Sequence, residues 1–444
     1  MGLFEFHSRK SEIEERKRRV RIELVISSRG KGRGGVFVAR HTSLDKKGIE
    51  AGTSEYSFLM ENSRQRRLSN HNGKMQKGAF YLPPEILCEI LSRLPVKYIL
   101  RCRSVCKEWC RLTLGPQFIN LQLSRVNHQL PQLILKSDNK VDGQSLLLLD
   151  TEGCNINKIP FKKRPSTSKR LNCLRLMCSC DGLLCIAADY LIQPVIILNP
   201  ITRESFPLPS PKRRAYVVSH QIGFHLDPSS GKYKVVREYR NMNSLNHDEG
   251  SSFEIITLGD KSWRKLSAPP VPIEYSLDAA VYWNGAFHWK IQERNDKSGD
   301  NCILGFNISD EKFYTISSHV RFGSSEYDLL VLGGCLSLVE HDVHLMRIWK
   351  VTGTKEEGFS LSFNCTYDTC VRWNKYLHYS VICQTSVDSF LLKVSREDGE
   401  NGANHWFVQF FPGKSLYSYL DIPGLPSRFR GVYFKPSFVS PKPA

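Results

Sequence analysis

Apolar and polar positions change their pattern twice along this chain. Up to about residue 80 the sequence is polar, contains many glycines and shows no sustained period. From Tyr81 to Phe118 apolar residues recur at steps of three and four, which is the period of amphipathic helices. From about 130 to 440, short apolar or alternating runs are separated by Gly, Pro, Asn and Asp, which predicts many strands. The three patterns predict an N-terminal arm, a small helical unit and a large β domain.

The helical unit begins where two prolines precede an apolar series. Pro83 and Pro84 suit the first turn of a helix, where amide hydrogens have no acceptor. The apolar residues that then follow helical spacing are Ile86, Leu87, Ile90, Leu91 and Leu94. Two more helices are predicted over 96–103 and 105–112, and Gly115-Pro116 is predicted to end the last one. A core built from about 45 residues is marginal by itself, so we expect this unit to bind a partner surface.

The helical unit resembles the F-box motif. Five blocks occur in the order of the motif: Leu82-Pro83-x-Glu85-Ile86, Ile90-Leu91-x-x-Leu94-Pro95-Val96-Lys97, Leu100-Arg101-Cys102-Arg103, Val105-Cys106-Lys107-x-Trp109, and Phe118. The main departure is Cys102, where the family often has an aromatic residue. The resemblance implies a three-helix module that binds a Skp-family adaptor and, through it, a cullin-RING ubiquitin ligase.

The same resemblance implies an adaptor-binding face. By their positions in the motif, the residues that contact the adaptor or support that face are Leu82, Pro83, Ile86, Ile90, Leu91, Leu94, Pro95, Leu100, Val105, Cys106 and Trp109. For Leu91 and Trp109, burial inside the module is an equal alternative, because a small helical unit needs some apolar residues for its own core. Under this interpretation the chain carries no catalytic residue and binds no cofactor or metal.

Two elements recur in the β region. A glycine turn precedes an apolar strand at Gly182, Gly285 and Gly334. A strand ending in a polar turn recurs at intervals of 59, 49, 43 and 44 residues, if the equivalent positions are Asn199, Leu258, Asn307, Lys350 and Val394. A four-stranded propeller blade takes about 40–50 residues, so this spacing predicts a β-propeller of six to seven blades. A large β-sandwich would not require the recurrence.

The β region also resembles the F-box-associated domain of plant F-box proteins. The phrases that carry this resemblance are Asp181-Gly182-Leu183-Leu184-Cys185 and Leu198-Asn199-Pro200-Ile201-Thr202-Arg203. Kelch-type propellers are similar as well, although the region keeps only one Gly-Gly pair, Gly333-Gly334. The predicted fold is multidomain, α plus all-β. A disordered basic arm occupies 1–78, an F-box 79–125, and a kelch-like propeller 130–440.

The net charge of +18 at first suggests nucleic acid or an anionic membrane as a partner. Residues 1–80, however, hold 18 basic and 9 acidic side chains, which is half of the excess in less than a fifth of the chain. The strongest run, Arg16-Lys17-Arg18-Arg19, is either a nuclear localisation signal or a solvated segment. Translation from Met75 is a further hypothesis, under which residues 1–74 would be absent from the native protein.

The compartment follows from what the sequence lacks. No apolar stretch reaches about 18 residues, so no membrane span is predicted. The first residues continue into charge instead of an apolar signal core, and we therefore expect the cytoplasm, the nucleus or both. The 14 cysteines are then expected to stay reduced.

Neither catalytic nor metal-binding motifs emerge from the sequence. Cys102, Cys106 and Cys110 recur at every fourth position, which would place them on one helical face, but no C-x-x-C pair accompanies them. His341 and His344 would point to opposite faces of a strand, so we expect a solvated turn there instead of a metal site. Nucleophile elbows, phosphate loops and H-E-x-x-H helices do not occur.

The two resemblances imply a substrate-recognition subunit of a Skp-cullin-F-box E3 ubiquitin ligase, which recruits an unidentified target protein through its propeller. The candidate target-binding loops are 210–215, 241–250 and 292–301. One alternative is an F-box scaffold without ligase activity. A less favoured one is a propeller that binds nucleic acid, suggested by Arg372-Trp373-Asn374-Lys375-Tyr376.

Overall fold

The chain divides into two compact units, Met1–Phe118 and Ile119–Ala444. The computed structural model describes residues 3–6, 19–27, 36–44, 50–59, 83–126, 132–137, 145–150, 155–160, 174–188, 195–210, 222–242, 248–270, 280–291, 302–317, 326–341, 345–354, 358–368, 377–386, 389–398 and 402–443.

Part of the N-terminal arm is a β-sheet. Its four antiparallel strands pair in sequence order and are β1 (Leu3–Phe6), β2 (Arg19–Ser27), β3 (Val36–Leu44) and β4 (Glu50–Leu59). The sequence predicted disorder over 1–78, and over these four ranges the structure has strands instead. In β2, Val20, Ile22 and Leu24 alternate with charged residues, which is the period of a strand.

Four helices follow, one more than predicted. They are α1 (Pro84–Leu91), α2 (Val96–Cys102), α3 (Lys107–Leu114) and α4 (Pro116–Val126). Within the first unit, α3 contacts both α1 and α2. Gly115-Pro116 ends the third helix as predicted, with Gly115 as the C-cap residue of α3, and Pro116 also starts α4, because a proline in the first turn needs no amide hydrogen bond.

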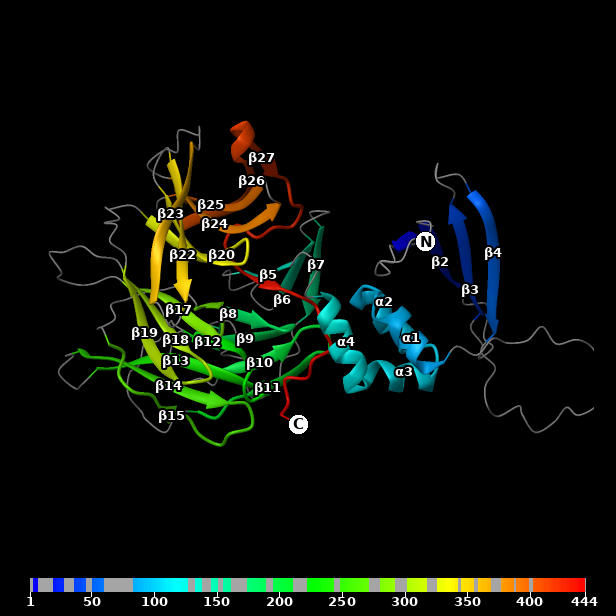
Figure 1. Ribbon diagram of the computed structural model, residues 1–444, viewed down its shortest axis with the longest axis horizontal. Coiled ribbons are helices and arrows are strands. Elements are labelled where there is room, and N and C mark those ends of the chain that lie inside the picture. The colour runs from blue at the N-terminus through cyan, green and yellow to red at the C-terminus, as the bar shows by residue number, and fades with distance from the viewer. Residues whose placement is uncertain are drawn as a thin grey trace, which may run out of the picture. The chain divides into compact units, whose positions relative to one another are not determined.

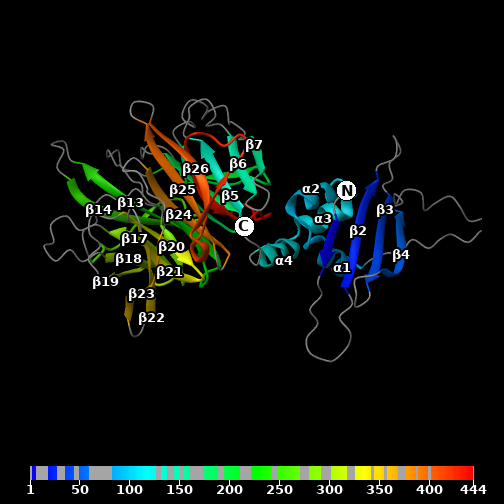
Figure 2. The same ribbon diagram turned by 90° about the horizontal axis from the view of Figure 1, so that it is seen from above.

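The β region is a six-bladed propeller, in agreement with the predicted six to seven blades (Figures 1 and 2). Blade 1 holds β8 (Leu174–Cys180), β9 (Leu183–Ala188), β10 (Ile196–Asn199) and β11 (Glu204–Pro207). Blade 2 holds β12 (Ile222–Asp227), β13 (Lys232–Met242), β14 (Asp248–Thr257) and β15 (Arg264–Lys265). Blade 3 holds β16 (Val281–Trp283), β17 (Ala286–Ile291), β18 (Cys302–Asn307) and β19 (Lys312–Ser317).

Blade 4 holds β20 (Glu326–Leu332), β21 (Cys335–His341), β22 (Leu345–Thr354) and β23 (Gly358–Asp368). Blade 5 holds β24 (Leu377–Ser386), β25 (Ser389–Asp398), β26 (Gly402–Phe411) and β27 (Leu416–Leu420). Blade 6 closes the ring by joining both ends of the domain: β28 (Phe429–Phe434) pairs with β5 (Gln132–Ser137), followed by β6 (Ser145–Asp150) and β7 (Asn155–Pro160).

The propeller's core lies between neighbouring blades, with a separate cluster of buried apolar side chains at each of the six interfaces. One example is Cys185 of blade 1 with Val235 of blade 2, and another is Phe253 of blade 2 with Trp289 of blade 3. The ring closure has its own cluster, in which Ile134 of blade 6 and Leu184 of blade 1 are fully buried. Each blade packs against a neighbouring blade on both of its faces. The central strands of a blade therefore need apolar side chains on both faces.

The repeated sequence elements correspond to fixed places in the blades. Gly182, Gly285 and Gly334 each lie in the turn between the first and second strands of a blade and have positive φ angles, as the glycine turns predicted. The prediction of five equivalent positions in the second repeat was partly wrong. Its first four positions fall in or directly after third strands, whereas Val394 lies in β25, the second strand of blade 5. Second and third strands are both central and buried, so their apolar runs look alike in sequence.

Candidate partner-binding surfaces

The residues predicted to form the adaptor-binding face differ in exposure. Four are exposed, namely Pro83, Ile86, Pro95 and Leu100. Four are half-buried, namely Ile90, Val105, Cys106 and Trp109. Leu91 and Leu94 are buried, and Leu82 lies outside the described residues. The face that can contact a partner is therefore narrower than the motif suggests.

Ile86 on α1 and Leu100 on α2 are the exposed large apolar residues of the predicted set, at 48% and 38%. Leu91, at 2%, packs inside the module, which is the alternative that the sequence left open for it. Leu114 on α3 is 55% exposed and is not part of the predicted face, because it lies between the Val105–Trp109 block and Phe118. Single exposed apolar residues are common on protein surfaces, so these three side chains are candidates for partner contact because they lie on the helices of the motif.

Cys106 has a local structural task. Its side chain caps α3, because its Sγ accepts a hydrogen bond from Trp109 N at 3.4 Å. Cys102 ends α2, and burial raises the pKa of its thiol to about 11. The expectation that Cys102, Cys106 and Cys110 share one helical face was wrong, because α2 and α3 are separate helices. In the helical unit, Cys88, Cys102, Cys106 and Cys110 are free thiols.

Within the described ranges, no group of three or more His, Cys, Asp or Glu side chains is placed to hold a metal ion. None of the described helices is both long enough and apolar enough to cross a membrane. His341, expected in a solvated turn, is instead buried at the end of β21, with its Nε2 2.8 Å from Asp328 Oδ2. Residues 342–344 lie outside the described ranges.

The two ends of the propeller differ in their connections. At one end, here called the hairpin end, blades 1 to 5 turn from their first to their second strand, and all six blades turn from their third to their fourth. These turns are short, as at 181–182, 200–203 and 284–285. The opposite end, here called the connection end, carries the remaining links, including those between blades. All three candidate target-binding loops belong there, and most of their residues lie outside the described ranges.

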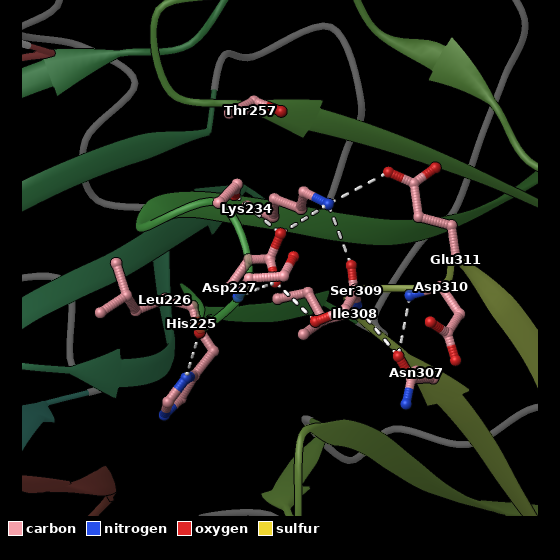
Figure 3. Close-up of polar contacts among 12 residues, drawn as sticks. His225, Leu226, Asp227, Lys234, Thr257, Asn307, Ile308, Ser309, Asp310 and Glu311 are labelled. Carbon is pink, nitrogen blue, oxygen red and sulfur yellow. Dashed lines mark hydrogen bonds and ion pairs between the residues drawn. The ribbon is translucent and has the colours of Figure 1, made fainter.

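A buried polar cluster joins blades 2 and 3 at the hairpin end (Figure 3). Asp227 is fully buried, and its carboxylate accepts hydrogen bonds from the hydroxyls of Ser309 at 2.7 Å and Ser230 at 2.7 Å. Lys234 Nζ lies 3.0 Å from Asp227 Oδ2 and also donates to Ile308 O at 3.0 Å. Burial alone would raise the pKa of Asp227, but these donors outweigh it and hold the pKa well below its usual range. The polar atoms are used to join blades, which indicates a structural cluster.

A second polar cluster lies where blades 3, 4 and 5 meet. Asp328 Oδ2 accepts hydrogen bonds from His341 Nε2 and, at 2.7 Å, from Val381 N of blade 5. Lys290 of blade 3 donates to Tyr327 O of blade 4 at 2.7 Å. Burial would raise the pKa of Asp328, but the charge and hydrogen bond of His341 lower it further than burial raises it. Asp328 thus ties blade 4 to blade 5 beside the link from blade 3.

Comparison with known families agrees with this architecture. The F-box domain family matches residues 80–120, and the F-box associated beta propeller domain family matches residues 150–392, more than half of the chain. The latter match ends before β26, β27 and β28 and begins after β5.

Curated relatives come from Arabidopsis thaliana. One F-box protein is 28% identical over 304 residues, covering 64% of this chain and 79% of its own. An F-box/kelch-repeat protein is 26% identical over 294 residues, covering 65% of this chain and 76% of its own.

Solved structures give only weak similarity. The Dos1 propeller aligns with a TM-score of 0.31 at 12% identity, covering 64% of this chain and 66% of its own. The hemagglutinin-neuraminidase ectodomain of parainfluenza virus 5 aligns with a TM-score of 0.33 at 10% identity, covering 59% of this chain and 81% of its own. The family assignment rests on the sequence relationships alone.

Proposed function

Because this chain belongs to the F-box proteins that carry an F-box-associated β-propeller domain, we propose that it is the substrate-recognition subunit of a Skp-cullin-F-box E3 ubiquitin ligase. The observation that carries the proposal is the presence of both domains in one chain. The F-box helices would bind a Skp-family adaptor, which connects them to a cullin, and the propeller would hold a target protein.

The adaptor side rests on the exposed apolar residues of the helical unit. Ile86 and Leu100 lie on different helices and are partly in water, and burying the parts still exposed would contribute about 1 kcal/mol each. Affinity in such interfaces comes from a few buried anchors. Leu91 and Leu94 would support the face from inside the module.

The target side is assigned to the connection end of the propeller. The longer links gather there, and links between scaffold strands are where binding residues are most often found. Holding a target near a ubiquitin-charged carrier raises its effective concentration, and this mechanism needs no catalytic residue in the chain itself. The mild basic excess of the region after residue 80 suits an acidic target surface.

The experiment that tests ligase function compares the full chain with Ile86→Asp/Leu100→Asp in cells. Proteins that bind the propeller are labelled by proximity with each form. Under the proposal, at least one labelled protein accumulates when the proteasome is inhibited and also when the double variant replaces the wild type. The scaffold alternative is favoured instead if every labelled protein keeps the same lifetime in all conditions.

Nucleic-acid binding is the other alternative. A filter-binding assay with the full chain and single-stranded RNA or DNA checks it, because binding to phosphates weakens steeply as salt rises. We expect no salt-sensitive binding by the propeller. Its aromatic and basic run at 372–376 lies outside the described residues.

Residence in the cytoplasm, the nucleus or both is part of the proposal, and imaging of the tagged full chain would test it.

A further inference from the structure

The chain continues past β28 as a C-terminal strap, defined here as residues 435–443, which crosses the hairpin end of blade 1 (Figure 1). Asn199, at the end of β10, is the main anchor and is fully buried. Its Nδ2 donates to Ser437 O at 3.0 Å and to Val439 O at 2.8 Å. Its Oδ1 accepts from the amides of Ile201 and Thr202 at 2.8 and 3.2 Å. One side chain thus holds its own turn with one end and the strap with the other.

Further contacts hold the strap along its length. Ser437 is fully buried, and its hydroxyl donates to Asp181 O in the first turn of blade 1. Lys442 Nζ lies 3.1 Å from Glu204 Oε1 at the start of β11. Because these contacts are separate from the pairing of β28 with β5, the strap and the ring closure use different hydrogen bonds.

The strap also holds α4. Gln122 on α4 is fully buried, and its Nε2 donates to Pro436 O at 3.2 Å, whereas its Oε1 has no partner. The carbonyls of Pro436 and Ser437, adjacent in the strap, therefore bind α4 and blade 1 respectively. The hydrogen bond to Pro436 O is the one that offsets the cost of burying this amide group. If it breaks, both polar atoms of the Gln122 side chain are buried without a partner.

We propose that the strap is a latch: it holds residues 119–126 of α4 against the propeller, and Asn199 is the residue that holds the strap in place. If the strap separates from Asn199, Pro436 O is no longer held in position, and its hydrogen bond with Gln122 is lost. The propeller ring stays closed, because β28 remains paired with β5. Since α4 leads in sequence from the F-box into the propeller, the latch gives the C-terminus control over the segment that joins the two modules. A coupling of this kind is reciprocal, so loosening α4 must also loosen the strap.

Hydrogen exchange of the full chain, followed by mass spectrometry, tests the latch with Asn199→Asp. Aspartate keeps the oxygen that accepts from Ile201 and Thr202, but it replaces the Nδ2 donor by an oxygen facing the carbonyls of Ser437 and Val439. The turn is thus preserved while the strap is repelled. We expect the amides of 119–126 to exchange at least tenfold faster than in the wild type, with blade 3 unchanged.

The matched control is Asn307→Asp. Asn307 occupies the corresponding turn of blade 3, where its Oδ1 accepts from Ser309 N and Asp310 N at 3.0 and 2.9 Å. This control is expected to leave exchange in α4 unchanged. The reciprocal variant, Gln122→Glu, removes the donor to Pro436 O and is expected to speed exchange of the amides at 437–439.

Two results overturn the latch. One is unchanged exchange of 119–126 in Asn199→Asp. The other is faster exchange in all six blades, since the strap would then be closing the ring instead of holding α4. If Asn199→Asp does not fold, Gln122→Glu decides alone: unchanged exchange at 437–439 contradicts the reciprocal coupling, and faster exchange confined to the strap supports it.

Discussion

Lys234 of blade 2 lies between Asp227 of the same blade and Glu311 of blade 3, with its Nζ 3.0 Å from Asp227 Oδ2 and 3.2 Å from Glu311 Oε1 (Figure 3). The side chains of Lys234 and Asp227 are only 10% and 1% exposed. A cation held this way is stabilising only while both carboxylates remain, because charge buried without a partner is costly. The cluster makes blades 2 and 3 depend on each other.

Asp227→Asn is therefore expected to lower the free energy of unfolding by about 3 kcal/mol, as in other buried ion pairs that lose one partner. Chemical denaturation measures the change. The matched control is Glu89→Gln, which breaks the pair of Glu89 and Arg93 at 2.6 Å, where both side chains are more than 40% exposed. Glu89→Gln should lower the free energy of unfolding by at most about 1 kcal/mol. Equal effects of the two substitutions would contradict the structural role of the cluster.

His288 predicts how stability depends on pH. It is fully buried beside Tyr314, whose hydroxyl lies 2.7 Å from its Nε2, and burial lowers its pKa to about 4. In the unfolded chain the pKa returns to about 6.5, so below that pH the unfolded state binds a proton that the native state refuses. Stability contributed by neutral His288 is thus complete above about pH 6.5 and falls as the pH drops towards 4.

Between the two pKa values, His288 alone is expected to lower the free energy of unfolding by about 1.4 kcal/mol for each pH unit of acidification. Urea unfolding of the wild type and of His288→Gln at pH 7, 6 and 5 checks it. The variant should start less stable at pH 7 and lose less stability on acidification. Parallel pH profiles for the two proteins would show that His288 is not the group that titrates.

Two glycine turns provide a matched pair. Gly182 and Gly285 have almost the same φ angles, +76° and +77°, so alanine strains the backbone equally at both, by about 1 kcal/mol. A Cβ at Gly285 would meet nothing within 4 Å, whereas at Gly182 it would lie 2.7 Å from Ser437 N and 2.8 Å from Lys435 O.

Gly182→Ala should therefore destabilise the protein by about 1–3 kcal/mol more than Gly285→Ala, because the added methyl group collides with the strap backbone. Thermal unfolding of both variants measures the difference. Equal losses would mean that the strap does not pack on this turn.

Local patterns were enough to predict the helices and the repeating blades. Helical spacing around Ile86 and the glycine turns at Gly182 and Gly285 are short-range signals, and both are present in the structure. Contacts between distant segments leave no such signal. Nothing in the spacing around Asn199 indicates that it binds Ser437, or that β28 closes the ring with β5. Burial of Leu94 could not be predicted either, because the packing of three short helices decides which apolar residues face inward.

Direct binding of a purified Skp-family adaptor to the full chain, measured by calorimetry, tests the central claim most directly. We predict a one-to-one complex that Ile86→Asp/Leu100→Asp weakens at least about 100-fold, since loss of two anchor residues costs several kcal/mol. Tyr419→Asp, at a propeller residue that is 71% exposed, is the control and should bind like the wild type. Absence of a complex, or equal affinity of the folded double variant, would contradict the account.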